Sequence, residues 1–295
     1  MEVVVFTSKN SGRSGTAFID KLSDLGSLNV RHLYYEDTII AVKDGAVLIP
    51  TLDTESCNLI YLRGKGYPYI RHALALYCDQ KGIAVVNAES FNFQCMTKLE
   101  QTVSFVINNI PVPDSVFVYN RDQYQLAVNS IRLSYPLVAK AIEGKDGIDN
   151  ILVNNLNELL NIPFDNAIIQ KFQPNNFDYR VVVAGDKVLT SYKRIRSPGS
   201  DGHTNNISQG GSRQYVDLPI ELCAMAVKAA NSINRNFTGV DIITNNKTGY
   251  SFVLEANYNF GTPLFDDLKD EKEYYFQVAS YFKELANRKS ILHQL

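Results

Sequence analysis

The fold of this chain is decided by two stretches of its sequence, Gly239-Val240-Asp241-Ile242-Ile243 and Tyr250-Ser251-Phe252-Val253-Leu254-Glu255-Ala256-Asn257. Both stretches consist mainly of apolar residues that favour β-strands. The segment between them, 244–249, contains Asn-Asn-Lys-Thr-Gly, which is typical of a turn. The pattern therefore predicts an antiparallel β-hairpin in the C-terminal part of the chain.

The expected register of this hairpin brings three polar side chains together. If Asp241 lies opposite Glu255, then Thr244 faces Phe252, and alternation along the strand puts Asn257 on the same face as Glu255. Carboxylate and amide oxygens are hard ligands that suit the Mg²⁺ carried by nucleotide phosphates. We therefore interpret these two carboxylates and the amide of Asn257 as metal ligands. The alternative is that the acidic residues are exposed hairpin positions with no shared role.

Composition limits the class of protein. The chain has 295 residues, of which 45% are hydrophobic and 20% charged, and this is ordinary for a soluble globular protein. The length favours two or three domains, because a single core usually stops growing below this size. The net charge is −2, and no run of Lys or Arg indicates a nucleic-acid-binding surface. No apolar stretch is long enough to span a bilayer, so we expect neither nucleic-acid binding nor membrane insertion.

The N-terminus and the cysteines indicate the compartment. The sequence starts directly with a strand-like segment at 3–6, without the basic and apolar regions of a signal peptide. The cysteines and histidines are not spaced like a zinc site or a disulfide framework; they are Cys57, Cys78, Cys95, Cys223, His32, His72, His203 and His293. We therefore expect a protein of the reducing cytoplasm.

Residues 1–90 are predicted to form a small parallel α/β domain, because short apolar stretches alternate there with helical ones. Strands are expected at 3–6, 30–34, 58–62 and 83–87, and helices at 15–25 and 69–80.

Two mixed lobes are expected to follow, at 91–170 and at 171–295. The first begins with a helix at 96–108, which the two prolines of 109–113 stop. It continues with a strand at 116–119, a helix at 123–131, a buried strand at 135–141 and a helix at 156–160. The second is rich in strands, at 167–172, 179–184 and 187–193. A polar, glycine-rich segment at 196–214 is interpreted as a loop, and helices are expected at 222–233 and at the end.

Lys140 ends an almost continuous apolar strand, and the segment 143–148 that follows contains two glycines. A strand-end ammonium beside flexible glycines suits a phosphate contact. The same lysine taken alone is better explained by a side chain that extends from the strand end into solvent. Further polar residues accompany it: Lys98, the pair Asp178 and Arg180 on one strand face, Lys193 and Arg194 on the hairpin partner, and Asn206 before two glycines.

Taken in order, these segments resemble the ATP-grasp superfamily and, within it, the RimK-like carboxylate–amine ligases. The resemblance covers roughly residues 83–285. It rests on Lys98-Leu99 with Ile110-Pro111-Val112-Pro113; Pro136-Leu137-Val138-Ala139-Lys140; Gln170-Lys171-Phe172; Asp178-Tyr179-Arg180; Val183-Ala184-Gly185-Asp186-Lys187-Val188; Lys193-Arg194; Asn206-Ile207-Ser208-Gln209-Gly210-Gly211; and the opening hairpin. It implies a nucleotide held between two α+β lobes that a small parallel α/β domain precedes.

The resemblance also implies a role for each residue. The nucleotide would be bound by Lys98, Lys140, Gly144, Gly147, Gln170, Lys171, Phe172, Asp178, Arg180 and Lys193. Within this set the two lysines 98 and 140 would contact the phosphates, residues 170–172 would line the adenine mainly through their backbone, and Asp178 would bind the ribose. One or two Mg²⁺ ions, with Mn²⁺ as an alternative, would bind Asp241, Glu255 and Asn257. Arg194, Lys140 and Asn206 would act on the transferred phosphoryl group.

Two positions leave the prediction open. An ideal two-residue turn at 185–186 puts Lys193, not Arg194, on the face of Asp178, whereas the family pattern favours Arg194; a β-bulge would reconcile the two. After Asn257 the chain continues with Tyr258-Asn259-Phe260-Gly261, where these ligases carry a small Ser-Pro-Gly turn. The pocket for the second substrate is therefore expected to differ.

The function implied is ATP-dependent ligation of a carboxylate to an amine through an acyl phosphate, with release of ADP and phosphate. The alternatives are a kinase of the same fold and a nucleotide-binding module without catalysis. Partners would be a carboxylate substrate and an amine acceptor, either an amino acid or a peptide, and a homo-oligomer is left open. The basic, aromatic loop 61–67 is interpreted either as a site for a carboxylate substrate or as an ordinary surface loop.

Overall fold

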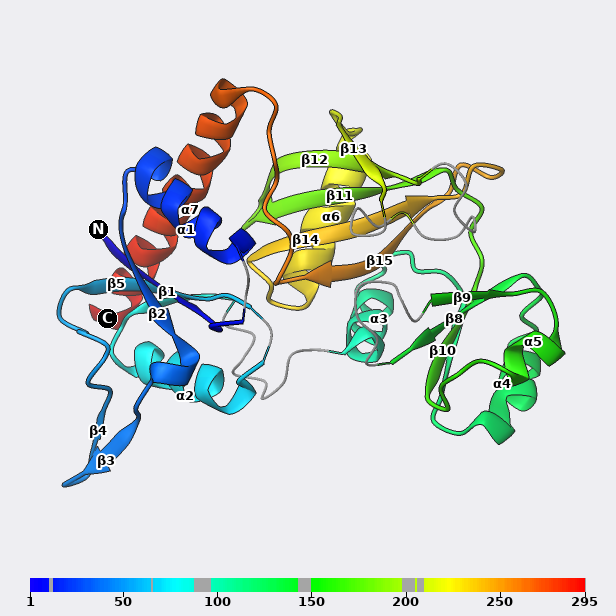
Figure 1. The fold of residues 1–295 in the computed structure, drawn as a ribbon, viewed down its shortest axis with the longest axis horizontal. Coiled ribbons are helices and arrows are strands. Elements are labelled where there is room, and N and C mark those ends of the chain that lie inside the picture. The colour runs from blue at the N-terminus through cyan, green and yellow to red at the C-terminus, as the bar shows by residue number, and fades with distance from the viewer. Residues whose placement is uncertain are drawn as a thin grey trace.

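A computed structural model gives the three-dimensional structure of this chain. It describes residues 1–10, 13–64, 66–87, 97–142, 150–197, 205 and 210–294. The described strands form one parallel and two antiparallel sheets, together with a small hairpin, and the three larger sheets lie side by side as separate bodies in Figure 1. The predicted fold class, a small parallel α/β domain before two α+β lobes, is confirmed.

The first sheet is parallel and has the strand order β2-β1-β5-β6. Its strands are β1 (Glu2–Thr7), β2 (Asn29–Tyr34), β5 (Cys57–Leu62) and β6 (Ala84–Val86). Helix α1 (Arg13–Gly26) packs Phe18 on one face, and helix α2 (Pro68–Gln80) packs Leu74 on the other. Because both faces are covered, the central strands are apolar along their whole length, as the sequence indicated.

The last helix, α7 (Leu268–Gln294), packs on α1 and on β5 and β6 of this parallel sheet, and it also contacts β12 of the C-terminal lobe, to which the sequence assigned it. Its residues Tyr275 and Phe282 are fully buried in the core that α1, β1 and β5 share. An ion pair between Lys21 of α1 and Glu271 of α7 lies at the edge of this contact. Of the helices in the described residues, including α7, none is long and apolar enough to cross a membrane.

A small hairpin that the sequence analysis did not predict projects from the N-terminal domain (Figure 1). It follows the short 3₁₀ helix η1 (Tyr35–Asp37) and consists of β3 (Ala41–Lys43) and β4 (Ala46–Leu48). Asp44 and Gly45 join the strands with φ angles of 51° and 77°. A type I′ turn requires positive φ at both central residues, and Asp-Gly is among its strongest sequence signals.

The central lobe is built on an antiparallel sheet with the order β7-β10-β8-β9. Its elements are β7 (Ser115–Val118), η3 (Arg121–Gln123), α4 (Tyr124–Ser130), β8 (Leu137–Ala141), β9 (Asn150–Val153), α5 (Leu156–Leu160) and β10 (Ala167–Lys171). Leu137, Ala139 and Ile169 share a core with α4 and α5 on one face. Side chains alternate along a strand, so Lys140 and Gln170 lie on the opposite face.

The C-terminal lobe is a five-stranded antiparallel sheet with the order β13-β12-β11-β14-β15. Its elements are β11 (Phe177–Ala184), β12 (Lys187–Ile195), β13 (Ser212–Tyr215), α6 (Ile220–Ser232), β14 (Phe237–Thr244) and β15 (Ser251–Asn257). Strand β13 lies within the segment that was predicted to be a loop.

Helices α6 and α3 (Lys98–Ile107) cover one face of the C-terminal sheet. The sequence predicted α3 as the first helix of the central lobe, but Phe105 is fully buried in the core beneath the C-terminal sheet. The first turn of α3 therefore belongs, by its packing, to the C-terminal side of the site.

Candidate active site

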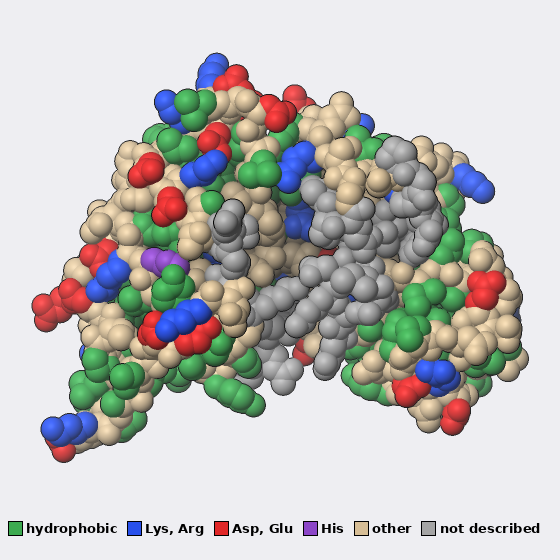
Figure 2. Space-filling view, viewed as in Figure 1, with side chains coloured by type: hydrophobic (Ala, Val, Ile, Leu, Met, Phe, Trp, Pro, Cys, Tyr) green, Lys and Arg blue, Asp and Glu red, His purple; other side chains and the backbone are tan. Residues whose placement is uncertain are grey.

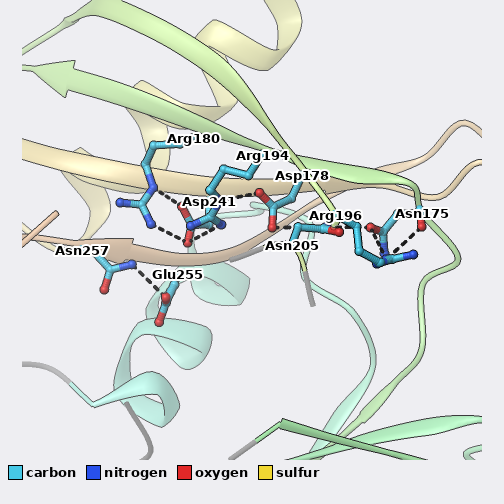
Figure 3. A network of polar contacts seen from close by, with 9 residues as sticks. All are labelled: Asn175, Asp178, Arg180, Arg194, Arg196, Asn205, Asp241, Glu255 and Asn257. Atoms are coloured by element: carbon cyan, nitrogen blue, oxygen red, sulfur yellow. Dashed lines mark hydrogen bonds and ion pairs between the residues drawn. The ribbon is translucent and has the colours of Figure 1, made fainter. Parts of the chain in front are cut away.

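The face of the C-terminal sheet opposite α3 and α6 carries most of the predicted site residues (Figure 3). Asp178 and Arg180 lie two residues apart on β11 and therefore share this face. On the neighbouring strands, Asp241 of β14 is directly opposite Arg180, and Arg194 of β12 is directly opposite Asp178. Backbone pairing alone thus brings two guanidinium groups and two carboxylates together.

The predicted pairing of Asp241 with Glu255 is confirmed, but the rest of the hairpin register is not. A bulge follows this pair, so that Thr244 faces Ser251 and not Phe252. The extra residue is on β15, and it shifts the pairing between the site and the turn by one position.

Asp241 lies between two guanidinium groups. Arg180 contacts it through two nitrogens, Nε at Oδ1 and Nη2 at 3.1 Å from Oδ2, and Nη2 of Arg194 is 3.0 Å from Oδ2. The Asp241 side chain is 4% exposed and each arginine side chain 10%. A buried ion needs a partner, and these contacts engage both carboxylate oxygens of Asp241.

Asp178 is the second carboxylate of this lattice. Nε of Arg194 donates to its Oδ1 at 2.6 Å, and Nδ2 of Asn205 donates to its Oδ2 at 3.4 Å. Burial raises the pKa of Asp178, against the opposing effect of the Arg194 charge. Burial alone would lower the pKa of Arg194, but Asp241 and Asp178 outweigh it and raise this pKa above its usual value. The guanidinium charge of Arg194 is therefore held firmly.

The structure decides between Arg194 and Lys193. A bulge at Leu189 of β12 shifts the hairpin so that Asp178 pairs with Arg194 and Tyr179 pairs with Lys193. Lys193 consequently points to the other face, where its Nζ lies 4.5 Å from the ring centroid of Phe177. The geometry favoured by the family pattern is present, and the ideal two-residue register is wrong.

Glu255 and Asn257 complete this face at β15. Nδ2 of Asn257 donates to Oε1 of Glu255 at 2.8 Å. Burial tends to raise the pKa of Glu255, but the charge of Lys98, the hydrogen bond from Asn257 and the charges of Arg180 and Lys140 together lower it. Glu255 is therefore a carboxylate anion at neutral pH.

The central lobe contributes a facing group. Nζ of Lys140 donates to Oε1 of Gln170 at 2.8 Å, and Nε2 of Gln170 donates to Oγ of Ser115 at 2.9 Å. Burial and, less strongly, the positive charge of Lys98 lower the pKa of Lys140 to about 8, whereas Glu255 and Asp241 act in the opposite direction. These mutual influences show that the polar faces of the two sheets share one electrostatic environment.

Lys98 enters the site from the first turn of α3. Thr97 and Glu100 form a capping box there, in which each side chain accepts a hydrogen bond from the other residue's backbone N–H. On the same helix, Oε1 of Gln101 accepts a hydrogen bond from the backbone N–H of Ala256 at 2.9 Å. The cap and this bond fix the start of α3 beside the strand of Glu255.

Gly239 of β14 lies where a larger residue has no room beside Arg180 and Phe260. A Cβ added there would lie 2.8 Å from Cδ of Arg180 and 2.9 Å from Cβ of Phe260. Both distances are shorter than real contacts, so a larger residue would displace the arginine that binds Asp241.

Several predicted residues are not brought into the cluster. Lys171 is half exposed and lies 4.0 Å from Asp114, and Lys193 is on the opposite face. The backbone N–H groups of Lys171 and Phe172 already donate to the carbonyls of Asp114 and Pro136. Gly144, Gly147 and Asn206 lie outside the described residues.

The structure adds polar residues that the sequence reasoning missed. Nη2 of Arg196 donates to the backbone oxygen of Asn175 at 3.2 Å, and Nδ2 of Asn205 donates to Oδ1 of Asn175 at 2.9 Å. Together they extend the lattice toward the segment that connects β10 with β11 (Figure 3). Arg196 could have been found from alternation, because it follows Arg194 by two residues.

Comparisons with known proteins agree with this geometry. The model of the RimK-like ATP-grasp domain matches residues 92–271. A probable alpha-L-glutamate ligase of Vibrio vulnificus (strain YJ016) is 29% identical over 206 residues, which cover 67% of each chain.

Two solved structures have the same fold. The ATP-grasp ligase PsnB, complexed with a minimal precursor variant, Mg and ADP, superposes with a TM-score of 0.70 at 15% identity and covers 96% of this chain and 98% of its own. A RimK domain protein of Sphaerobacter thermophilus has a TM-score of 0.65 at 17% identity and covers 96% of this chain and 99% of its own.

The fold and the charged cluster between its lobes thus define an ATP-dependent carboxylate–amine ligase. The chain belongs to the RimK-like ATP-grasp family, whose model covers more than half of its length.

Proposed function

We propose that this ligase forms an acyl phosphate in the cleft between the central and C-terminal lobes and transfers the acyl group to the amine of an amino acid or a peptide. The observation that supports this most is the arrangement of Arg194, Asp241 and Lys140 across two facing sheets. Phosphoryl transfer requires positioning and neutralisation of charge rather than a side-chain nucleophile.

The nucleotide phosphates are proposed to bind between Lys140 and Lys98. The lowered pKa of Lys140, to about 8, reflects a buried ammonium beside a second cation. Anionic phosphate offsets both the burial of the Lys140 charge and its repulsion by Lys98, because it supplies negative charge to the two ammonium groups. Gln170, which accepts from Lys140 at 2.8 Å, holds the ammonium in place.

The donor set of Asp241, Glu255 and Asn257 fits a hard divalent cation such as Mg²⁺. Glu255 is ionised and adjoins the amide of Asn257, and Asp241 supplies the second carboxylate. When bound there, Mg²⁺ neutralises phosphate charge as the terminal phosphoryl group is transferred. Asp241 can act as a ligand with both arginines in place, because its two oxygens offer about four acceptor positions and Arg180 and Arg194 use three of them.

The reaction then has two steps. An oxygen of the substrate carboxylate attacks the terminal phosphorus of ATP, the bond from that phosphorus to the oxygen of ADP breaks, and Arg194 stabilises the developing charge. The amine nitrogen next attacks the acyl carbon, the bond to phosphate oxygen breaks, and inorganic phosphate and a proton leave. Water competes with the amine, so closure of the lobes is part of the proposal.

The substrate class is proposed from two kinds of relative. The related Vibrio protein is named a probable glutamate ligase, and PsnB has been solved with precursor peptides. One name refers to an amino acid and the other to a peptide, and this supports amino-acid or peptide substrates for this chain. Residues Tyr258–Phe260 replace the small turn of these ligases, so the individual substrate of this chain is proposed to differ from theirs.

The test is a hydroxylamine trap. The protein is incubated with ATP, Mg²⁺ and a panel of amino acids and short peptides, and hydroxylamine captures any acyl phosphate as a hydroxamate. We expect hydroxamate and ADP in equal amounts with at least one carboxylate, and neither after chelation of the metal. Asp241→Asn should abolish both products.

A stable phosphorylated compound that resists hydroxylamine would contradict the proposal, as would full activity of Asp241→Asn. Glu255→Gln is the matched variant on the adjacent strand. It removes a proposed metal ligand without removing the carboxylate that pairs with Arg180 and Arg194, so it should lose turnover but unfold at a denaturant concentration closer to that of the unmodified protein.

A further inference from the structure

The N-terminal parallel sheet has its own switch point, away from the phosphate cluster. In the order β2-β1-β5-β6, the chain leaves β1 toward β2 on one side and leaves β5 toward β6 on the other. The connecting helices α1 and α2 cover opposite faces of the sheet. The connections that leave the carboxyl ends of β1 and β5 therefore diverge, and open α/β sheets bind ligands in the crevice at such a point.

Arg63 lies at this edge, directly after β5. It is 4% exposed, and its guanidinium donates to three neutral acceptors: the hydroxyl of Tyr61, the backbone oxygen of Phe260 and Oγ1 of Thr262. All three distances are 3.4 Å, which is long for a hydrogen bond. No carboxylate among the described residues is in ion-pair contact with this guanidinium. A buried guanidinium ordinarily has such a partner.

The loops around Arg63 leave space. Gly64 and Gly66 have φ angles of 97° and 96°, which L side chains rarely adopt. A Cβ added to Gly66 or to Gly261 would meet no described atom within 4 Å, and one added to Gly64 would meet only the backbone nitrogen of Ser8 at 4.0 Å. The molecule is hollowed near the middle of the face in Figure 2, between its N-terminal and C-terminal parts, with basic side chains in the hollow.

The walls of this crevice are tied together by Glu36. Its Oε1 accepts from Oγ of Ser8 at 2.7 Å, from the backbone N–H of Lys9 at 3.0 Å and from the hydroxyl of Tyr67 at 2.8 Å. These bonds connect the ends of β1, β2 and β5. Three donors hold Oε1 of this carboxylate, which braces the loops, and no ion pair in the described residues joins it to Arg63.

The crevice adjoins the proposed reaction site along the chain. Arg63 contacts Phe260, and Phe260 follows the proposed metal ligand Asn257 by three residues. Three residues of extended chain span at most about 11 Å. An amino acid carries its carboxylate next to its amine, so a carboxylate held near Arg63 would leave the amine within reach of an acyl phosphate.

We propose that Arg63, at the carboxyl edge of the N-terminal sheet, binds the free carboxylate of the amine substrate, and that this substrate is a free amino acid. The inference rests on the proposed ligase function. It assigns the second substrate to the N-terminal domain and leaves the acyl phosphate between the two lobes. The carboxylate supplies the charge that the buried guanidinium lacks, and it replaces long bonds to neutral groups with charge-assisted ones.

The experiment compares acids with amides. The twenty L-amino acids and their α-carboxamides are tested against the protein with AMPPNP and Mg²⁺, by thermal shift and then by calorimetry for those that bind. Arg63→Gln should weaken binding of the preferred acid by about 10- to 100-fold, the loss expected for a charge-assisted hydrogen bond. It should leave the amide and AMPPNP unchanged. Arg63→Lys should retain part of the preference for the acid.

The matched control is Arg71→Gln. Arg71 is also 4% exposed at this edge, lies 4.6 Å from the ring centroid of Tyr258 and donates to the backbone oxygen of Leu62. Its replacement disturbs the same contact between domains but should preserve the difference between acid and amide. Equal weakening of acid, amide and AMPPNP in both variants would mean that Arg63 only clamps the domains, and would overturn the proposal.

Two further outcomes are decisive. Retention of the preference for the acid in Arg63→Gln, or the absence of carboxylate-dependent binding by every amino acid in the unmodified protein, would also overturn it. Failure of the proposed ligase function gives a different result: the hydroxylamine trap yields no hydroxamate from any donor. The binding of amino acids is measured independently of that trap, so the two failures can be distinguished.

Discussion

The polar faces of the C-terminal and central sheets differ in the partners of their basic residues, which are carboxylates on the first sheet and a neutral amide on the second. On the C-terminal sheet, Arg180 and Arg194 hold Asp178 and Asp241 in a buried lattice. On the central sheet, Lys140 donates to the neutral amide of Gln170. The first face keeps its geometry before any ligand arrives, as a site that stabilises a transition state should. The second face holds an ammonium that gains most from an incoming anion.

The largest effect is expected for Arg194→Ala. The change removes the guanidinium that joins Asp178 to Asp241 and leaves two buried carboxylates close together. We expect kcat for ADP release to fall by about 100- to 1,000-fold, the loss typical for one preorganised donor. Stability in urea should fall by about 3–5 kcal/mol. Normal kcat in this variant would mean that the lattice is only a structural element.

Lys140→Ala should act on affinity. Because its partner is the phosphate chain, we expect ATP to bind about 10- to 100-fold more weakly, whereas adenosine binds as before. Calorimetry with both ligands measures the difference. Equal weakening for ATP and adenosine would mean that Lys140 has a structural role and does not contact phosphate, so the two faces would no longer differ in function.

The pH dependence of ATP binding should sharpen the same contrast. Burial and the neighbouring Lys98 lower the pKa of Lys140 to about 8, so the free protein loses this charge as pH rises through that value. Anionic phosphate favours the protonated form, and ATP affinity should therefore be constant below about pH 7 and decline above about pH 8. Lys140→Arg, which stays charged, should flatten the profile. An unchanged decline in this variant would assign the titration to another group.

The smallest effect is expected for Lys193→Ala, next to the largest in sequence. Lys193 lies on the face away from the cleft, over the ring of Phe177. Its removal should change kcat by no more than about threefold, as for substitutions away from a site, and stability by about 0.5–1 kcal/mol. Steady-state kinetics beside Arg194→Ala is the test, and a severe loss of kcat would show that the bulge at Leu189 does not persist in solution.

Much of the site could be predicted from strand alternation. The pairing of Asp241 with Glu255 and the shared face of Asp178 and Arg180 follow from a repeat of two residues. The bulges in β12 and β15 could not be predicted from this repeat, because an extra residue breaks it without a marked change in composition. The engagement of Asp241 by two arginines was equally inaccessible, since it depends on three strands that are distant in sequence.

The fold shows the same division. The parallel order of the N-terminal domain follows from its alternating apolar stretches, and the β3–β4 hairpin was missed although Asp44-Gly45 is a strong local signal. The partners of α3 and α7 could not be read from the sequence. An apolar helix face shows that a helix is buried but carries no information about which sheet buries it.

The packing of α7 makes the N-terminal domain the last part of the molecule to be completed. Its parallel sheet is synthesised within the first 86 residues, yet the helix that buries Phe18 and β5 begins only at Leu268. During synthesis, the apolar surface formed by α1 and the parallel sheet therefore stays exposed until both lobes and then α7 have been made. The two ends of the polypeptide meet in one core, which also includes Val182, Ala184 and Phe237 of the C-terminal lobe, so residues 1–90 alone lack a large part of the surface that buries their sheet.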